Sequence, residues 1–160
     1  MKKMSEMPDF ARVWIYQASR ILSQEEMDLV QQEASVFMGQ WSSHGAQLDA
    51  TFDIMHSRIL VIAADEQQAQ ASGCGIDKSV RFVKELGTRI GVDFFNRTVV
   101  LYLENENLCD VSLHEFWGLR KALVVTDDTV VIDTTIRTVG QLRSEFQKPF
   151  SRSWHAEMWG

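Results

Sequence analysis

Cysteine and proline are both scarce in this sequence. Its 160 residues include two cysteines, Cys74 and Cys109, and two prolines. Small secreted domains that depend on disulfides carry many more cysteines, so the disulfide-scaffold class is excluded. Because the two cysteines are far apart and follow no export signal, we expect both to be free thiols.

An excess of positive charge is also missing. Sixteen lysines and arginines stand against 22 aspartates and glutamates, which gives a formal net charge of -6. A surface that follows the phosphates of nucleic acid needs an excess of basic side chains. We therefore expect no nucleic-acid partner.

Long hydrophobic runs are absent as well. No stretch reaches the ~18 apolar residues of a membrane span, and the first residues, Met-Lys-Lys-Met-Ser-Glu-Met-Pro, lack the apolar core of a signal peptide. We expect a cytoplasmic protein with no membrane partner. The length predicts a single domain over residues 1–160, with a partly ordered arm at 1–11 and a docked aromatic tail at 149–160.

Apolar periodicity predicts an α+β fold. Strands and helices follow one another in the order βαββαβ, at residues 13–18, 23–41, 48–54, 59–64, 76–90 and 98–103. This order is typical of a ferredoxin-like two-layer sandwich, for which we predict one mixed sheet. Residues 104–110 have the composition of an exposed turn, and residues 112–147 add a helix, a strand and a helix at the C-terminal end.

The first candidate site is the small-residue loop Ser72–Ser79, which runs directly into the second predicted helix. A thiol at a helix N-terminus lies where free N–H groups and the helix dipole favour its ionised form, which makes Cys74 a candidate nucleophile. Lys78 adds positive charge one turn later. The alternative is that Cys74 is a small residue packed in a glycine turn.

The same loop is a candidate binding site for an anion or a small molecule. Gly73 and Gly75 let successive backbone N–H groups converge on one point, and Ser72 and Lys78 complete the set. A phosphate-binding loop needs glycine immediately before its lysine, but Asp77 stands there. The residues therefore disfavour an ATPase.

Two tryptophans and a histidine extend this candidate site. Trp41 and Trp154 are candidate walls of a pocket, although large aromatic residues more often belong to the core. His44 is a candidate general base for Cys74, or a residue that caps the preceding helix. The four histidines and two cysteines form no metal-ligand spacing, so we expect no metal and no cofactor.

Four segments together resemble a known family. They are Val13–Gln17, Trp41 with His44-Gly45, Ala71–Asp77 and Ser153–His155. In this order and chain length they are similar to a small family of bacterial cytoplasmic proteins that often carries the label "ABC transporter ATPase". The resemblance spans nearly the whole chain and implies no established activity, catalytic residue or cofactor. The residues lack both a phosphate loop and a transporter signature, so they do not support the label.

Three functions remain open after these observations. The first is a small ligand-binding or regulatory domain with its site at Ser72–Ser79. The second is a thiol-dependent enzyme that uses Cys74 and His44. The third is an interaction module or homodimer that uses the aromatic C-terminal segment as a contact surface.

Overall fold

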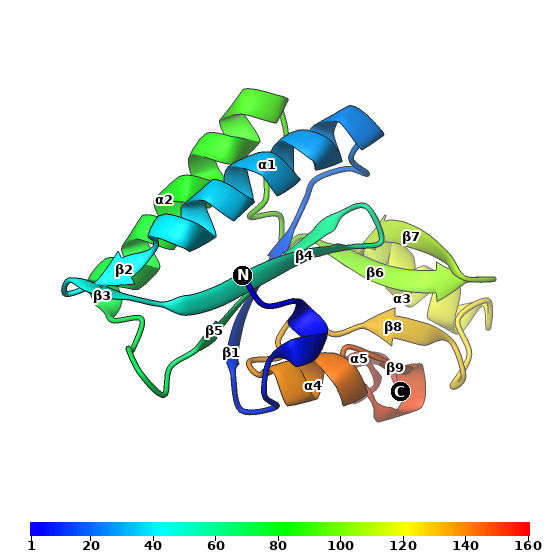
Figure 1. The fold of residues 1–160 in the computed structure, drawn as a ribbon. Coiled ribbons are helices and arrows are strands. Elements are labelled where there is room, and N and C mark those ends of the chain that lie inside the picture. Colours follow the sequence, from blue (N-terminus) through cyan, green and yellow to red (C-terminus); the bar gives the residue numbers. More distant parts are fainter. The chain divides into compact units, whose positions relative to one another are not determined.

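The structure is a computed structural model that describes residues 1–160 and has an α+β fold. Its contacts divide the chain into two compact units (Figure 1). The first unit comprises residues 1–96 and 137–140, and the second comprises residues 97–136 and 141–160. None of the helices is long and apolar enough to cross a membrane.

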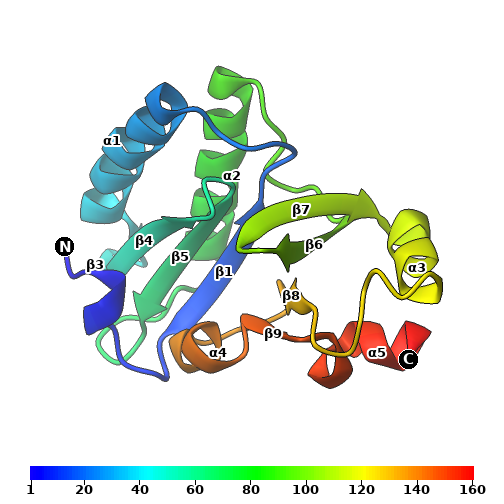
Figure 2. The same ribbon diagram turned by 90° about the vertical axis from the view of Figure 1, so that its right-hand side faces the viewer.

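The first unit contains a three-stranded sheet with two helices on one face (Figures 1 and 2). The strands β1 (Arg12–Gln17), β5 (Ile59–Asp65) and β4 (Asp49–Met55) pair in that order, each antiparallel to its neighbour. The helices are α1 (Gln24–Gln40) and α2 (Gly73–Ile90). Every residue of β5 is buried, as its continuously apolar sequence predicts.

Two sequence signals account for the local structure of this unit. The capping box before α1 is confirmed, because Ser23 Oγ accepts from the N–H of Glu26 and the Glu26 carboxylate accepts from the N–H of Ser23. The hairpin between β4 and β5 is also confirmed. His56 and Ser57 both have a φ of 54°, the left-handed conformation that tight hairpin turns use.

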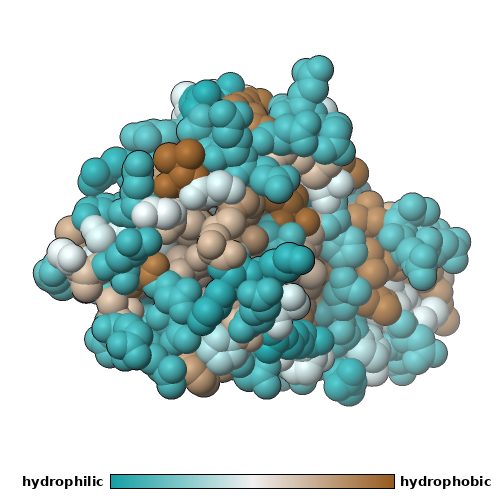
Figure 3. Space-filling view, in the orientation of Figure 1, coloured by the Kyte–Doolittle hydropathy of each residue, from teal (hydrophilic) through white to brown (hydrophobic).

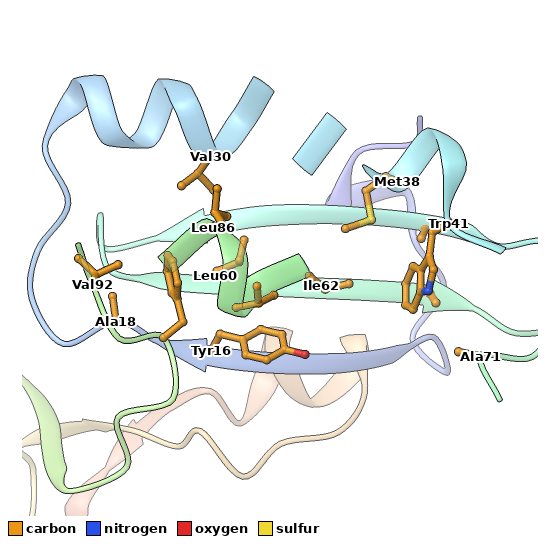
Figure 4. Packing of buried hydrophobic residues seen from close by; sticks show 14 of the residues in the cluster. Tyr16, Ala18, Val30, Met38, Trp41, Leu60, Ile62, Ala71, Leu86 and Val92 are labelled. Carbon is orange, nitrogen blue, oxygen red and sulfur yellow. The ribbon is translucent and has the colours of Figure 1, made fainter. Parts of the chain in front are cut away.

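The core of the first unit lies between the sheet and the two helices. Figure 4 shows how the helix side chains meet the sheet there. The core includes Tyr16, Val30, Met38, Trp41, Leu60, Ile62, Val83, Leu86 and Phe94. Alternation along β1 and β5 places every second side chain on this face, which is why the strands and helices bury a common surface.

Three short elements complete the first unit. They are the 3₁₀ turn η1 (Met4–Glu6) and the two strands β2 (Ser42–Ser43) and β3 (Ala46–Gln47), which pair as a small hairpin. In the N-terminal segment, Met1 is 71% exposed, whereas Met7 and Ala11 are buried. The segment is therefore anchored at its C-terminal end.

The second unit is built on a four-stranded antiparallel sheet in the order β7-β6-β8-β9. Its elements are β6 (Val99–Glu104), β7 (Asn107–Ser112), α3 (Leu113–Lys121), β8 (Val130–Ile132), β9 (Gln147–Pro149), η2 (Phe150–Arg152) and α5 (Trp154–Trp159). Helix α4 (Val139–Ser144) contains the boundary between the units. Phe116 lies at the centre of the core, with Phe150, His155 and Trp159 around its ring.

The ferredoxin-like prediction is right for three strands and wrong for the fourth. Strands β1 and β4 run parallel with β5 between them, as the split βαβ arrangement requires. The fourth predicted strand exists as β6, but it belongs to the second sheet. Beside β1, isolated bridges to Phe95 and Thr138 occupy the place where that strand was expected. The sheets are antiparallel, so the predicted mixed sheet is also wrong.

Strand β6 belongs to the second sheet because of the segment at 104–110, which was predicted as an exposed turn. Only Asn105 and Glu106 form the turn, with φ values of 50° and 68°, and β7 follows at once. Strand β7 pairs with one edge of β6 over its whole length, and β8 pairs with the other edge. With both edges occupied, β6 has no edge left for the first sheet.

Candidate functional site

The predicted site loop is largely helical. Helix α2 begins at Gly73, with Ser72 as its N-cap, so Cys74 lies in the first helical turn. Glycine is unfavourable in helix interiors, so the sequence predicted that this helix begins later. The first turn tolerates glycine because its N–H groups have no intrahelical partner.

A packed joint connects the end of α1 to the start of α2. The indole Nε1 of Trp41 donates a hydrogen bond of 2.8 Å to the carbonyl oxygen of Gly75. The hydroxyls of Ser43 and Ser72 are also hydrogen-bonded to each other. A Cβ on Gly75 would lie 3.2 Å from Ser43 Cβ, so the two segments are in close contact. Of the predicted residues, Trp41 therefore contacts Gly75 directly, and Ser72 joins the same joint through Ser43.

The remaining ligand candidates of the first unit lie on the surface of α2. Gly73 and Cys74 are exposed, and Lys78 Nζ lies 3.4 Å from the carbonyl oxygen of Ser42. The Ser72 hydroxyl makes no side-chain cap to the helix, and the first turn contains no acidic residue. The chemical capacity of this turn is that of an uncapped helix N-terminus.

Cys74 and His44 are not joined by a hydrogen bond in the structure. His44 and Gly45 form the turn between β2 and β3, with φ values of 51° and 79°, and both are exposed. The C-cap of α1 is Trp41, so His44 does not cap that helix. Trp154 belongs to the second unit, where its ring stacks on His155 with 3.8 Å between the centroids.

Two hollows of the first unit lie elsewhere, along α1 and β4. One has a volume of about 590 Å³ and is bordered by Met38 of α1 and by Asp49 of β4. The other has a volume of about 610 Å³ and is bordered by Met27 of α1 and by Asp53 of β4. Both share Met1, Lys2 and Ser35 in their lining. We call the two hollows together the α1–β4 groove.

One stripe of α1 forms the first wall of the groove. Its members recur at spacings of three and four residues, which places them on one face: Gln24, Met27, Gln31, Ser35 and Met38. At 1.5 Å per residue this stripe is about 21 Å long. An extended chain of about six residues has the same length.

The second wall of the groove is the outer edge of β4. This strand pairs with β5 on one side and with no strand on the other. An edge strand presents backbone N–H and C=O groups that can pair with another extended chain. The carboxylates of Asp49 and Asp53 give this edge negative charge.

The N-terminal residues lie in the groove. Lys2 Nζ is 2.8 Å from the Asp49 carboxylate, and Met1 to Ser5 border one hollow. Figure 1 shows the N-terminus beside β4. Figure 3 views the same face, where apolar residues form separate brown and tan patches among hydrophilic ones.

Sequence patterns indicate part of this groove. The alternation from Leu48 to Ile54 correctly placed Asp49 and Asp53 on a strand. The stripe on α1 is mostly polar, so it did not stand out from an ordinary solvated helix face. How α1 lies against β4 depends on contacts between segments that periodicity does not describe.

A comparison with protein-family models, with curated proteins and with solved structures finds no match to this chain. Its function must therefore be inferred from its own residues.

Proposed function

We propose that the protein is an interaction domain that binds an extended segment of another protein in the α1–β4 groove. The observation that carries this proposal is the unpaired edge of β4. This edge borders a groove whose length matches that of a short extended chain. Added strands bind through main-chain hydrogen bonds, and pockets for alternate side chains supply specificity. The two hollows offer space for such side chains.

The ligand-binding and thiol-enzyme functions at Ser72–Ser79 have less support. A small-molecule pocket at Ser72–Ser79 was expected to use Trp41 as a wall, but the Trp41 side chain is 1% exposed and packs against Gly75. A thiol enzyme needs a base within hydrogen-bond reach of its nucleophile. Cys74 has no such partner, which leaves the uncapped first turn of α2 as its only activating feature.

Peptide display tests the proposal directly. A library of random heptapeptides is selected on the full chain, and the affinities of the selected peptides are measured. The blocking variant is Ser35→Trp, because Ser35 is exposed and borders both hollows. The matched control is Gln32→Trp, which places the same side chain on an exposed part of α1 outside the groove.

We expect saturable binding that falls at least about tenfold in Ser35→Trp and stays unchanged in Gln32→Trp, a difference of about 1.4 kcal/mol in binding free energy. Hydrogen exchange should slow at the amides of β4 when peptide is bound. The proposal fails if no peptide binds saturably, or if binding is the same in both variants.

A further inference from the structure

Residues Met1 to Lys3 lie where a bound segment would lie. Met1 and Lys2 border both hollows, and Lys3 borders one of them. The ammonium of Lys2 is hydrogen-bonded to Asp49 Oδ2 at 2.8 Å. The groove therefore already holds a basic side chain, that of Lys2.

The charge around Lys2 is negative on several sides. The hydrogen bond and charge of Asp49 raise the pKa of Lys2, and the charges of Asp65 and Glu6 act in the same direction. Asp53 borders the groove further along β4. A cationic side chain is favoured at this position because carboxylates from separate elements surround it.

Met1 and Lys2 are held weakly in the groove, and the hydrogen bonds of Lys3 run to Glu6 of the same segment. The side chains of Lys2 and Asp49 are 45% and 38% exposed, and exposed ion pairs are screened by water and salt. Met1 is largely exposed. The buried side chain of Met7 fixes the chain behind them, so these residues can leave the groove while the rest of the segment stays in place.

We infer that residues 1–3 are a built-in competitor for the groove, and that the partner is an extended segment with a lysine or arginine that replaces Lys2 at Asp49. This inference rests on the proposed function. It adds the chemistry of the partner and a regulatory contact. The apparent affinity for a partner is then reduced by the fraction of molecules whose own arm occupies the groove.

The experiment uses full-length chains and two labelled probes. One probe is the hexapeptide Met-Lys-Lys-Met-Ser-Glu with a C-terminal fluorophore, and the other has glutamine in place of both lysines. Each is titrated by fluorescence anisotropy against the native chain, Lys2→Gln, Asp49→Asn and the control Asp77→Asn. Asp77 is exposed on α2 and gives the same charge change outside the groove.

We expect the lysine probe to bind Lys2→Gln at least about threefold more tightly than the native chain, because the competing side chain is weakened. The native chain and Asp77→Asn should prefer the lysine probe over the glutamine probe. Asp49→Asn should bind the two probes equally. High salt should reduce the preference wherever it occurs.

Three outcomes would overturn the inference. If library-selected peptides bind the native chain and Lys2→Gln equally and show no basic residue, the inference fails while the proposed function stands. If neither the library-selected peptides nor the labelled probes bind any of the chains, the proposed function fails too. If the native chain instead forms dimers that Asp49→Asn abolishes, the occupant is the arm of a second copy rather than a separate partner.

Discussion

The indole nitrogen of Trp41 donates a 2.8 Å hydrogen bond to the carbonyl oxygen of Gly75. Trp41 ends α1 and Gly75 lies in the first turn of α2, so this bond joins two elements that are distant in the sequence. The ring of Trp41 also contacts Trp14 and Phe37. A buried indole N–H needs an acceptor, and the first turn of α2 supplies one.

Two glycines of this turn should respond in opposite ways to alanine. In Gly75→Ala the new Cβ would lie 3.2 Å from Ser43 Cβ, in a joint already fixed by hydrogen bonds. In Gly73→Ala no atom lies within 4 Å, and alanine restricts the unfolded chain more than glycine does. We expect Gly75→Ala to be less stable than Gly73→Ala by about 1–2 kcal/mol in urea unfolding. Equal stabilities would contradict the close packing of the joint.

The sequence predicted the three long strands and the two helices of the first unit because each has a local cause. The capping box at Ser23 starts α1, and the continuous apolar run at 59–64 marks a strand buried on both faces. Local signals could not predict the sheet to which β6 belongs, because this depends on its pairing with β7. The sequence of β7 is polar, so it was not recognised as a strand. The tight turn at Asn105 and Glu106 lets β7 pair with β6, and this pairing distinguishes the observed fold from the predicted one.

The thiol hypothesis makes a prediction about relative reactivity. The side chain of Cys74 is exposed, whereas Cys109 is half-buried and lies within contact of Glu104 and the backbone of Asn107. We expect iodoacetamide to modify Cys74 faster than Cys109 in the native chain, because the Cys74 side chain is the more accessible to the reagent. Mass spectrometry of timed digests gives both rates. In urea the two rates should converge, and a native rate that is faster at Cys109 would contradict the prediction.

The candidate site was less predictable than the fold, for a physical reason. Glycine, serine and cysteine in Ser72–Ser79 suggest a loop with chemistry, yet the same small residues are what a tight joint between two helices needs. The groove, by contrast, is bordered by common polar residues such as Gln31 and Ser35. Its shape comes from the distance between α1 and the edge of β4, which no single segment encodes.

A buried histidine should make stability depend on pH. The His155 side chain is 1% exposed, and burial lowers its pKa to about 4, with Asp133 raising it and Lys148 lowering it to smaller extents. The unfolded chain binds this proton near pH 6.5, so the unfolded state holds more protons between pH 6.5 and 4. Stability should therefore fall as pH decreases through that range, by about 2 kcal/mol between pH 7 and pH 5.

Urea unfolding of His155→Phe at both pH values measures this contribution. Phenylalanine keeps an aromatic ring beside Phe116 but does not titrate. We expect the variant to lose most of the stability difference between pH 7 and pH 5. The control His114→Gln removes an exposed histidine of the same unit and should keep the native difference. An unchanged pH dependence in His155→Phe would assign the effect to other groups.

The end of α3 contains a leucine in a conformation that favours glycine. Leu123 has a φ of 57°, its N–H donates to the carbonyl of Arg120, and the N–H of Val124 donates to that of Leu119. This is the Schellman pattern, in which the left-handed position is usually glycine. The Leu123 side chain is 70% exposed, so it gains little from burial that would offset the strained backbone.

Leu123→Gly should therefore stabilise the protein, by about 0.5–1 kcal/mol, because relief of the left-handed strain exceeds the added entropy of the unfolded chain. The matched control is Val124→Gly, which removes a 58% exposed side chain from a neighbouring residue whose φ is not positive. That variant should lose about 0.5–1 kcal/mol, since it gains only unfolded-state entropy. The urea midpoints of both variants are measured together and compared with that of the native chain. If both move downward, Leu123 makes a stabilising contact that outweighs the backbone strain at this position.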